Sequence, residues 1–180
     1  MKGIVFTEFI EMLEDKFSPE LADNVISRSE LESGGAYTAV GTYDHNELLR
    51  MVGVLSEITE KPANELVYTF GRHLFCRFTE HYPDFFAGIN NSFDFLDTIE
   101  KHVHVEVRKL YPDAELPRFA TERPDGHTMI MTYDSMRPFG DLALGLIEGS
   151  VEYYGEDVKV ESDDLSEDKT QVRFTLKQAV

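Results

Sequence analysis

The hydrophobic positions in the first half of the chain recur at the spacing of amphipathic helices. In the first segment these positions are Val5, Phe9, Ile10, Leu13 and Phe17. A second helix is predicted to begin at SPEL, because Ser18 is a suitable N-cap and Pro19 suits the first turn. Two more helices are predicted from DHNELLRMVGVLSEI, where Asp44 and Glu47 approach a capping box, and from KPANELVYTFGRHLFCRF.

The second half changes to short segments that alternate between polar and apolar residues. Residues 115–137 predict a β-hairpin around the turn PDG, and residues 157–177 predict a second hairpin with a charged turn. Between them, GDLALGLIEGSVEYYG returns to a helical pattern that Gly155 ends. We therefore predict one α+β domain over residues 1–180. It would consist of a helical subdomain at about residues 1–65 and an α+β subdomain with a small antiparallel sheet at about 66–180.

The segment KHVHVEVRKLYP contains two histidines two residues apart, His102 and His104. A helix over residues 96–111 would have an apolar stripe of Leu96, Ile99, Val103, Val107 and Leu110. The two histidines flank this stripe on opposite edges. The flank of His104 contains Glu100 and aromatic residues and that of His102 more charge, which slightly favours His104 as the inward one. A strand is the alternative, because HVHVEV alternates with period two and would place both histidines on one solvent-facing side. A single histidine is also commonly a surface or core residue without a ligand.

Tyr133, Ser135 and Arg137 alternate along the segment TMIMTYDSMRP. On a strand, all three side chains would share one face, with about 6–7 Å between successive members. Asp134 would point to the other face, so two hydroxyl groups and one guanidinium would lie together without an acid. Such a set of donors suits a phosphate or a pair of carboxylates. An exposed polar strand face is the alternative interpretation.

Composition excludes several classes of partner and site. The net charge of −17 opposes binding to nucleic acid or to an anionic membrane. Cys76 is the one cysteine, so we expect no structural zinc held by several cysteines, and we expect Cys76 itself to be a small core residue. No segment reaches the roughly 18 apolar residues of a membrane span, and the N-terminus lacks the apolar run of a signal peptide. The cytoplasm is therefore the expected compartment.

Taken together, these segments resemble the haem–nitric oxide/oxygen binding family, the H-NOX domains, which include the sensor domain of soluble guanylate cyclase and bacterial relatives. The resemblance rests on Tyr-x-Ser-x-Arg beginning 29 residues after the histidine of HVEVRKLYP. It extends over essentially the whole chain through MKGIVF, FGRHLF, FFAG, LPRF and LGLIEGS. It implies a haem buried between a helical distal lobe and an α+β proximal lobe, in a bacterial stand-alone member of the nitric oxide-selective branch.

The resemblance assigns roles to four polar residues. His104 matches the proximal ligand of the haem iron, a role that imidazole fills in many haem proteins. Tyr133, Ser135 and Arg137 match the residues that hold the two haem propionates, whereas His102 has no matching role. The chain contains no Cys-x-x-Cys-His motif, so the expected cofactor is non-covalent haem b with ferrous iron.

The resemblance also assigns the apolar walls of the haem site. Pro117 matches a proline that packs against the porphyrin and bends it, and Val5 and Leu146 would cover the porphyrin faces.

The distal positions decide which gas the resemblance implies. Relatives that bind dioxygen stably have a tyrosine five residues after the arginine of the motif, where this chain has Leu142. Phe9 and Leu74 match the other distal positions, and none of the three donates a hydrogen bond. A site without donors stabilises nitric oxide or carbon monoxide better than dioxygen.

The resemblance implies a sensor rather than an enzyme. The chain contains no kinase, cyclase or phosphodiesterase segment, so its expected partner in trans is a histidine kinase or a cyclic-di-GMP synthase or hydrolase. One alternative is a haem enzyme with peroxidase-like activity, which usually needs a distal histidine or arginine. The other is a non-haem module that binds a carboxylated or apolar ligand at Tyr133, Ser135 and Arg137.

Overall fold

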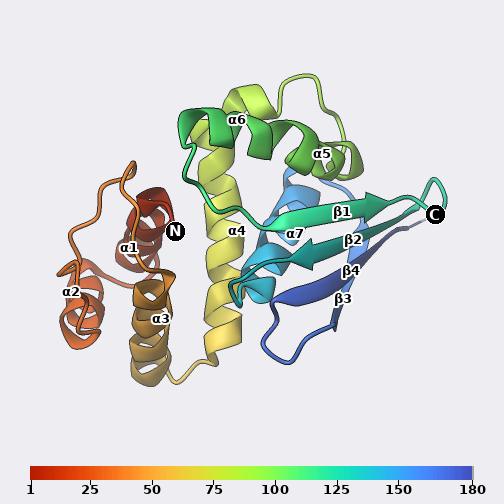
Figure 1. The fold of residues 1–180 in the computed structure, drawn as a ribbon. Helices are drawn as coiled ribbons and strands as arrows, with labels where there is room; N and C mark the ends of the chain where they lie inside the picture. The colour runs from red at the N-terminus through yellow and green to blue at the C-terminus, as the bar shows by residue number, and fades with distance from the viewer. Residues whose placement is uncertain (180) are drawn as a thin grey trace.

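The structure, a computed structural model, describes residues 1–179 as a mixed α+β fold (Figure 1). The helices are α1 (Gly3–Lys16), α2 (Pro19–Arg28), α3 (His45–Thr59), α4 (Ala63–His81), α5 (Ser92–Thr98), α6 (His104–Leu110) and α7 (Gly140–Tyr153). A 3-10 turn lies at Pro83–Phe85 and a π-helical turn at Ile99–Val103. The strands are β1 (Arg118–Glu122), β2 (Thr128–Asp134), β3 (Val158–Asp164) and β4 (Gln171–Gln178).

The four strands form one antiparallel sheet in the order β1-β2-β4-β3. β1 pairs with β2 across the PDG turn, and β3 pairs with β4 across the charged turn, so both predicted hairpins are confirmed. The inward side chains of the two central strands are fully or almost fully buried: Met129, Met131, Phe174 and Leu176. Figure 1 shows α7 behind this sheet, where it covers the buried face.

The hydrophobic core has two parts, which meet at α4 and α7. The first lies among the N-terminal helices and α4 and includes Phe6, Phe9, Met12, Leu13, Leu48, Met51, Leu55, Phe70 and Leu74. The second lies between the sheet, α5 and α7. Leu146 on α7 packs against both parts. Because α4 contributes to both, a subdomain boundary near residue 65 remains a prediction. Among residues 1–179, no helix combines the length and hydrophobicity needed to cross a membrane.

The helix that carries the two histidines differs from the prediction. Residues 92–110 are helical, which rules out the strand alternative, but the N–H of His104 bonds to the carbonyl of Ile99 across a π turn. One extra residue in that turn rotates the following helix relative to a regular α-helix. His104 is therefore buried and His102 exposed, while Leu110, predicted in the apolar stripe, is 66% exposed.

Two smaller expectations were also wrong. Asp44 caps α3 by accepting the N–H of Asn46 at 3.0 Å, but Glu47 does not complete a capping box. The Glu47 carboxylate instead accepts hydrogen bonds from Ser33 and Tyr37, which fold the preceding loop over α3. Cys76 is exposed rather than in the core, because it lies on the outer side of α4.

Two glycines bring the backbones of α4 and α7 into direct contact. The Cα atom of Gly71 would lie 2.9 Å from a Cβ added to Gly145, and that Cβ would also overlap the carbonyl oxygen of Tyr68. A Cβ on Gly71 would in turn overlap the carbonyl of Leu142. This contact therefore fixes the position of Leu74 on α4 relative to Leu142 and Leu146 on α7.

Replacing Gly145 by alanine should destabilise the fold by about 1–3 kcal/mol, because the added methyl group meets backbone atoms that cannot rotate away. Urea unfolding measures this change. Gly53→Ala on α3 is the matched control, because a Cβ added there would meet no neighbouring part of residues 1–179 within 4 Å. It should stabilise the protein by about 0.5–1 kcal/mol through helix propensity. Equal stability of the two variants would contradict the close contact of α4 and α7.

Candidate functional site

His104 is a buried histidine whose ring is held in one orientation. Its side chain is at the start of α6, and the residue is 9% exposed. Nδ1 lies 2.8 Å from Oε1 of Glu100. An ionised carboxylate only accepts hydrogen bonds, so Nδ1 carries the proton and Nε2 keeps its lone pair. Within residues 1–179, Nε2 makes no hydrogen bond to another residue. Burial lowers the pKa of His104, which favours this neutral form.

Glu100 is itself fixed from a second direction. Its Oε1 also accepts the backbone N–H of Phe119, the second residue of β1, at 3.1 Å. The Phe119 ring lies between two site residues, with centroids 6.0 Å from the His104 ring and 5.6 Å from the Tyr133 ring. Sequence reasoning placed Glu100 on the side of His104 but missed this pairing, although the four-residue spacing was a signal for it.

The polar motif is not the predicted one-sided strand. β2 ends at Asp134, so Tyr133 is its last buried residue and Ser135 and Arg137 lie in the turn before α7. The Tyr133 hydroxyl donates to the carbonyl of Arg137 at 3.1 Å, and the N–H of Arg137 donates to Oγ of Ser135 at 3.1 Å. The two hydroxyl groups therefore shape the turn that presents Arg137. Burial raises the pKa of Tyr133, so its hydroxyl keeps its proton.

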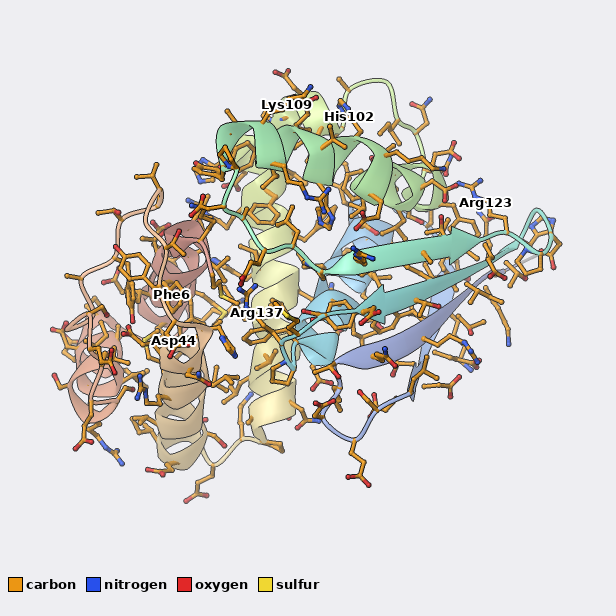
Figure 2. The ribbon with its side chains drawn as sticks, viewed as in Figure 1. Phe6, Asp44, His102, Lys109, Arg123 and Arg137 are labelled. Carbon is orange, nitrogen blue, oxygen red and sulfur yellow. The ribbon has the colours of Figure 1, made fainter. Side chains whose placement is uncertain are left out.

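An acid accompanies Arg137, contrary to the sequence expectation. The guanidinium donates to the backbone carbonyl of Glu115 at 2.8 Å and pairs with the Glu115 carboxylate. Figure 2 places Arg137 between the N-terminal helices and the strands. The amino group of Met1 and the ring of His45 lie close enough that Arg137 helps to lower both of their pKa values, after burial as the main cause. Basic groups from three segments thus gather at this point, and sequence reasoning missed two of them.

The predicted apolar residues come together on three helices. Phe9 on α1 and Leu74 on α4 are almost completely buried. Val5 on α1, and Leu142 and Leu146 on α7, are partly buried and pack against the same core. These five side chains contain no hydrogen-bond donor.

Pro117 is half-buried in the segment between α6 and β1, two residues after Glu115. This segment joins the helix of His104 to the strand that fixes Glu100, and Pro117 is the residue directly before that strand.

These residues fit a haem better than a bare metal ion. Residues 1–179 contain no group of three or more His, Cys, Asp or Glu side chains that could hold a metal. A haem needs only an axial ligand from the protein, because the porphyrin supplies the other four nitrogen atoms. His104 offers an oriented nitrogen, Arg137 offers a cation for a propionate, and the apolar side chains suit a porphyrin face.

A family model described as Haem-NO-binding matches residues 2–162. The chain belongs to the H-NOX family. The unliganded Fe(II) H-NOX protein from K. algicida is 39% identical, with a TM-score of 0.93, over 100% of this chain and 97% of that chain. The IWP-051-bound H-NOX from Shewanella woodyi, in the Fe(II)CO state, is 42% identical, with a TM-score of 0.85, over 99% and 95%.

A further solved structure, that of a mutant H-NOX from T. tengcongensis, is 28% identical, with a TM-score of 0.88, over 100% of this chain and 98% of that chain. No curated protein matches the chain. H-NOX domains are haem-based sensors of gases such as NO, CO and O₂ that signal to partner proteins, and they are not enzymes. The expected fold, family and non-enzymatic class are thereby confirmed.

A charged cluster lies between α1 and α4 of this H-NOX domain. Glu8 on α1 is 4% exposed, and Nε of Arg77 on α4 donates to it at 2.9 Å. Among residues 1–179, Nε2 of His73 is buried without a hydrogen-bond partner, 3.9 Å from the same carboxylate. Burial lowers the pKa of His73, with Glu8 opposing and Lys16 assisting. The cluster was not anticipated from the sequence, because it requires α1 to pack along α4.

Stability should fall as the pH drops below about 6.5, the ordinary pKa of histidine. The folded-state pKa of His73 is below that value, so the unfolded chain binds more protons than the folded one, and falling pH stabilises the unfolded state. His73→Gln should reduce this loss without abolishing it, because burial also lowers the pKa values of His45 and His104. Urea unfolding between pH 5 and 8, with the exposed His127→Gln as control, measures the effect; identical profiles for His73→Gln and wild type would contradict it.

Proposed function

We propose that this H-NOX domain senses nitric oxide through non-covalent ferrous haem b and regulates a separate signalling protein. The observation that carries the proposal is the buried His104 ring, whose Nδ1–H is bound to Glu100 and whose Nε2 is free to ligate iron. When bound, the haem would supply a ferrous iron with a coordination position for a diatomic gas.

Arg137 would hold a propionate, with Tyr133 and Ser135 acting mainly on the turn that presents it. The guanidinium side chain is 13% exposed and already pairs with a carboxylate, that of Glu115. A charged hydrogen bond in such a place is stronger than one in open water. Pro117, on the segment that carries Glu115, would contact the porphyrin edge or face.

The distal wall supports selectivity for nitric oxide and carbon monoxide over dioxygen. Phe9, Leu74 and Leu142 present only carbon atoms, and the Phe9 ring packs edge-on against Phe70 with centroids 5.1 Å apart. Bound dioxygen is polar, so a wall without a hydrogen-bond donor gives it little stabilisation.

His104 would connect gas binding to movement. It lies where the π turn meets α6, so iron ligation would pin this junction from inside the protein. Loss of that ligation would leave the junction held by contacts such as those of Glu100 with β1. The junction would thus have two arrangements, one with and one without the bond to iron. A ligand that favours one of them shifts the equilibrium between the two. The expected partner is a histidine kinase or a cyclic-di-GMP synthase or hydrolase in the cytoplasm.

A peroxidase-like haem enzyme is disfavoured, because no histidine or arginine occupies the matched distal positions Phe9, Leu74 and Leu142. A non-haem module is disfavoured because the Tyr133 and Ser135 hydroxyls are used within their own turn.

Purified protein reconstituted with haem should show a Soret band that depends on His104. His104→Gly should lose it, or lose axial ligation, and free imidazole should restore it by filling the space of the missing ring. His102→Gly is the matched control, since it introduces the same helix-weakening residue at an exposed position two residues away. Absorption spectra measure both. No Soret band in the wild-type protein, or equal loss in both variants, would contradict the proposal.

Leu142→Tyr should slow dioxygen dissociation about tenfold or more, because a hydroxyl group in the distal wall adds a hydrogen bond to the bound gas. Stopped-flow absorption of the reduced, haem-loaded protein mixed with dioxygen measures the rate. Leu142→Phe fills a similar volume without the hydroxyl and should behave as wild type. A wild-type protein that already retains dioxygen in air would argue against the assignment to the nitric oxide-selective branch.

A further inference from the structure

We infer that Glu100 positions His104 and tunes it as an iron ligand. His104 would then bind the iron more strongly than an imidazole without a carboxylate partner. The inference rests on the proposed function of His104. It starts from one contact, the 2.8 Å hydrogen bond between Nδ1 of His104 and Oε1 of Glu100.

The contact spans the π turn. Glu100 is the second residue of the turn and His104 the first residue after it. Their four-residue spacing places the two side chains on the same inward face, where the side chain of His104 is 11% and that of Glu100 29% exposed.

Glu100 is positioned independently of α6. The N–H of Phe119 donates to the same Oε1, and this donor belongs to β1, which pairs with β2 in the sheet. The carboxylate therefore has an anchor on the sheet that does not belong to α6. One turn earlier, Asp97 makes a parallel contact with β1 by accepting the hydroxyl of Thr121 at 2.6 Å.

The chemical effect follows from the direction of the hydrogen bond. A carboxylate that accepts the Nδ1–H of an imidazole increases electron density on Nε2 and fixes the tautomer and orientation of the ring. A more basic Nε2 binds iron more strongly and stabilises the ferric over the ferrous state. In a sensor that responds by releasing its histidine, Glu100 would set how readily His104 detaches.

Glu100→Gln tests the inference on the haem-loaded protein. Glutamine retains an oxygen that can accept from His104 and Phe119 but removes the negative charge. We expect a lower iron–histidine stretching frequency in resonance Raman spectra, a more positive reduction potential, and an about tenfold shift toward His104 detachment after nitric oxide is added.

Asp97→Asn is the matched control, because it removes a charge from the same segment and from a contact with the same strand. A purely structural role of the carboxylates would move both variants alike, whereas tuning moves only Glu100→Gln. Unchanged Raman frequency and potential in Glu100→Gln, or equal shifts in Asp97→Asn, would overturn the inference.

A second measurement needs neither haem nor a variant that folds. Nitrogen-15 NMR of the unloaded wild-type protein reports which ring nitrogen of His104 carries the proton. A proton on Nδ1 supports the pairing with Glu100, and a proton on Nε2 overturns it. A wild-type protein that binds no haem would refute the proposed function alone, while the NMR result would still decide the pairing.

Discussion

The close approach of α4 and α7 is the constraint on which the rest of the molecule depends. Gly71 and Gly145 let the two backbones touch, and no side chain fits between them. The N-terminal helices pack on one side of this pair and the sheet on the other (Figure 1). Leu74 and Leu142 of the distal wall thus come from two helices whose separation is fixed by backbone atoms, which vary little in shape.

The opposite wall of the site depends on a local irregularity rather than on regular packing. A π turn at Ile99–Val103 directly precedes His104, which is buried with its Nδ1 bound to the Glu100 carboxylate. π turns are rare and often occur at functional sites, because they cost backbone stability that only a specific side-chain position justifies. Here the turn is supported from the sheet by the bond between Phe119 and Glu100. The histidine and its carboxylate therefore form one unit with β1.

The charges near Arg137 show why residue type alone gives an incomplete account of a binding site. The motif residues Tyr133 and Ser135 are donors in the sequence, but in the fold they stabilise the turn that holds Arg137. Glu115 arrives from the segment after α6 and shares the guanidinium. A propionate at this point would meet both an acid and several basic groups, so its affinity depends on their balance rather than on Arg137 alone.

The sequence by itself determined the elements and the family. The helical spacing and the two hairpins are local properties that the structure confirmed, and the family match confirmed the resemblance that rested on the motif and His104. Helical spacing alone left His102 and His104 nearly equivalent, because a regular helix places them symmetrically about an apolar stripe. The family resemblance favoured His104, and the tertiary structure shows that His104 is buried and bound to Glu100 while His102 is exposed. The contact of Glu100 with β1 and the acid beside Arg137 arise between segments distant in the chain. Such contacts have no period in the sequence to reveal them.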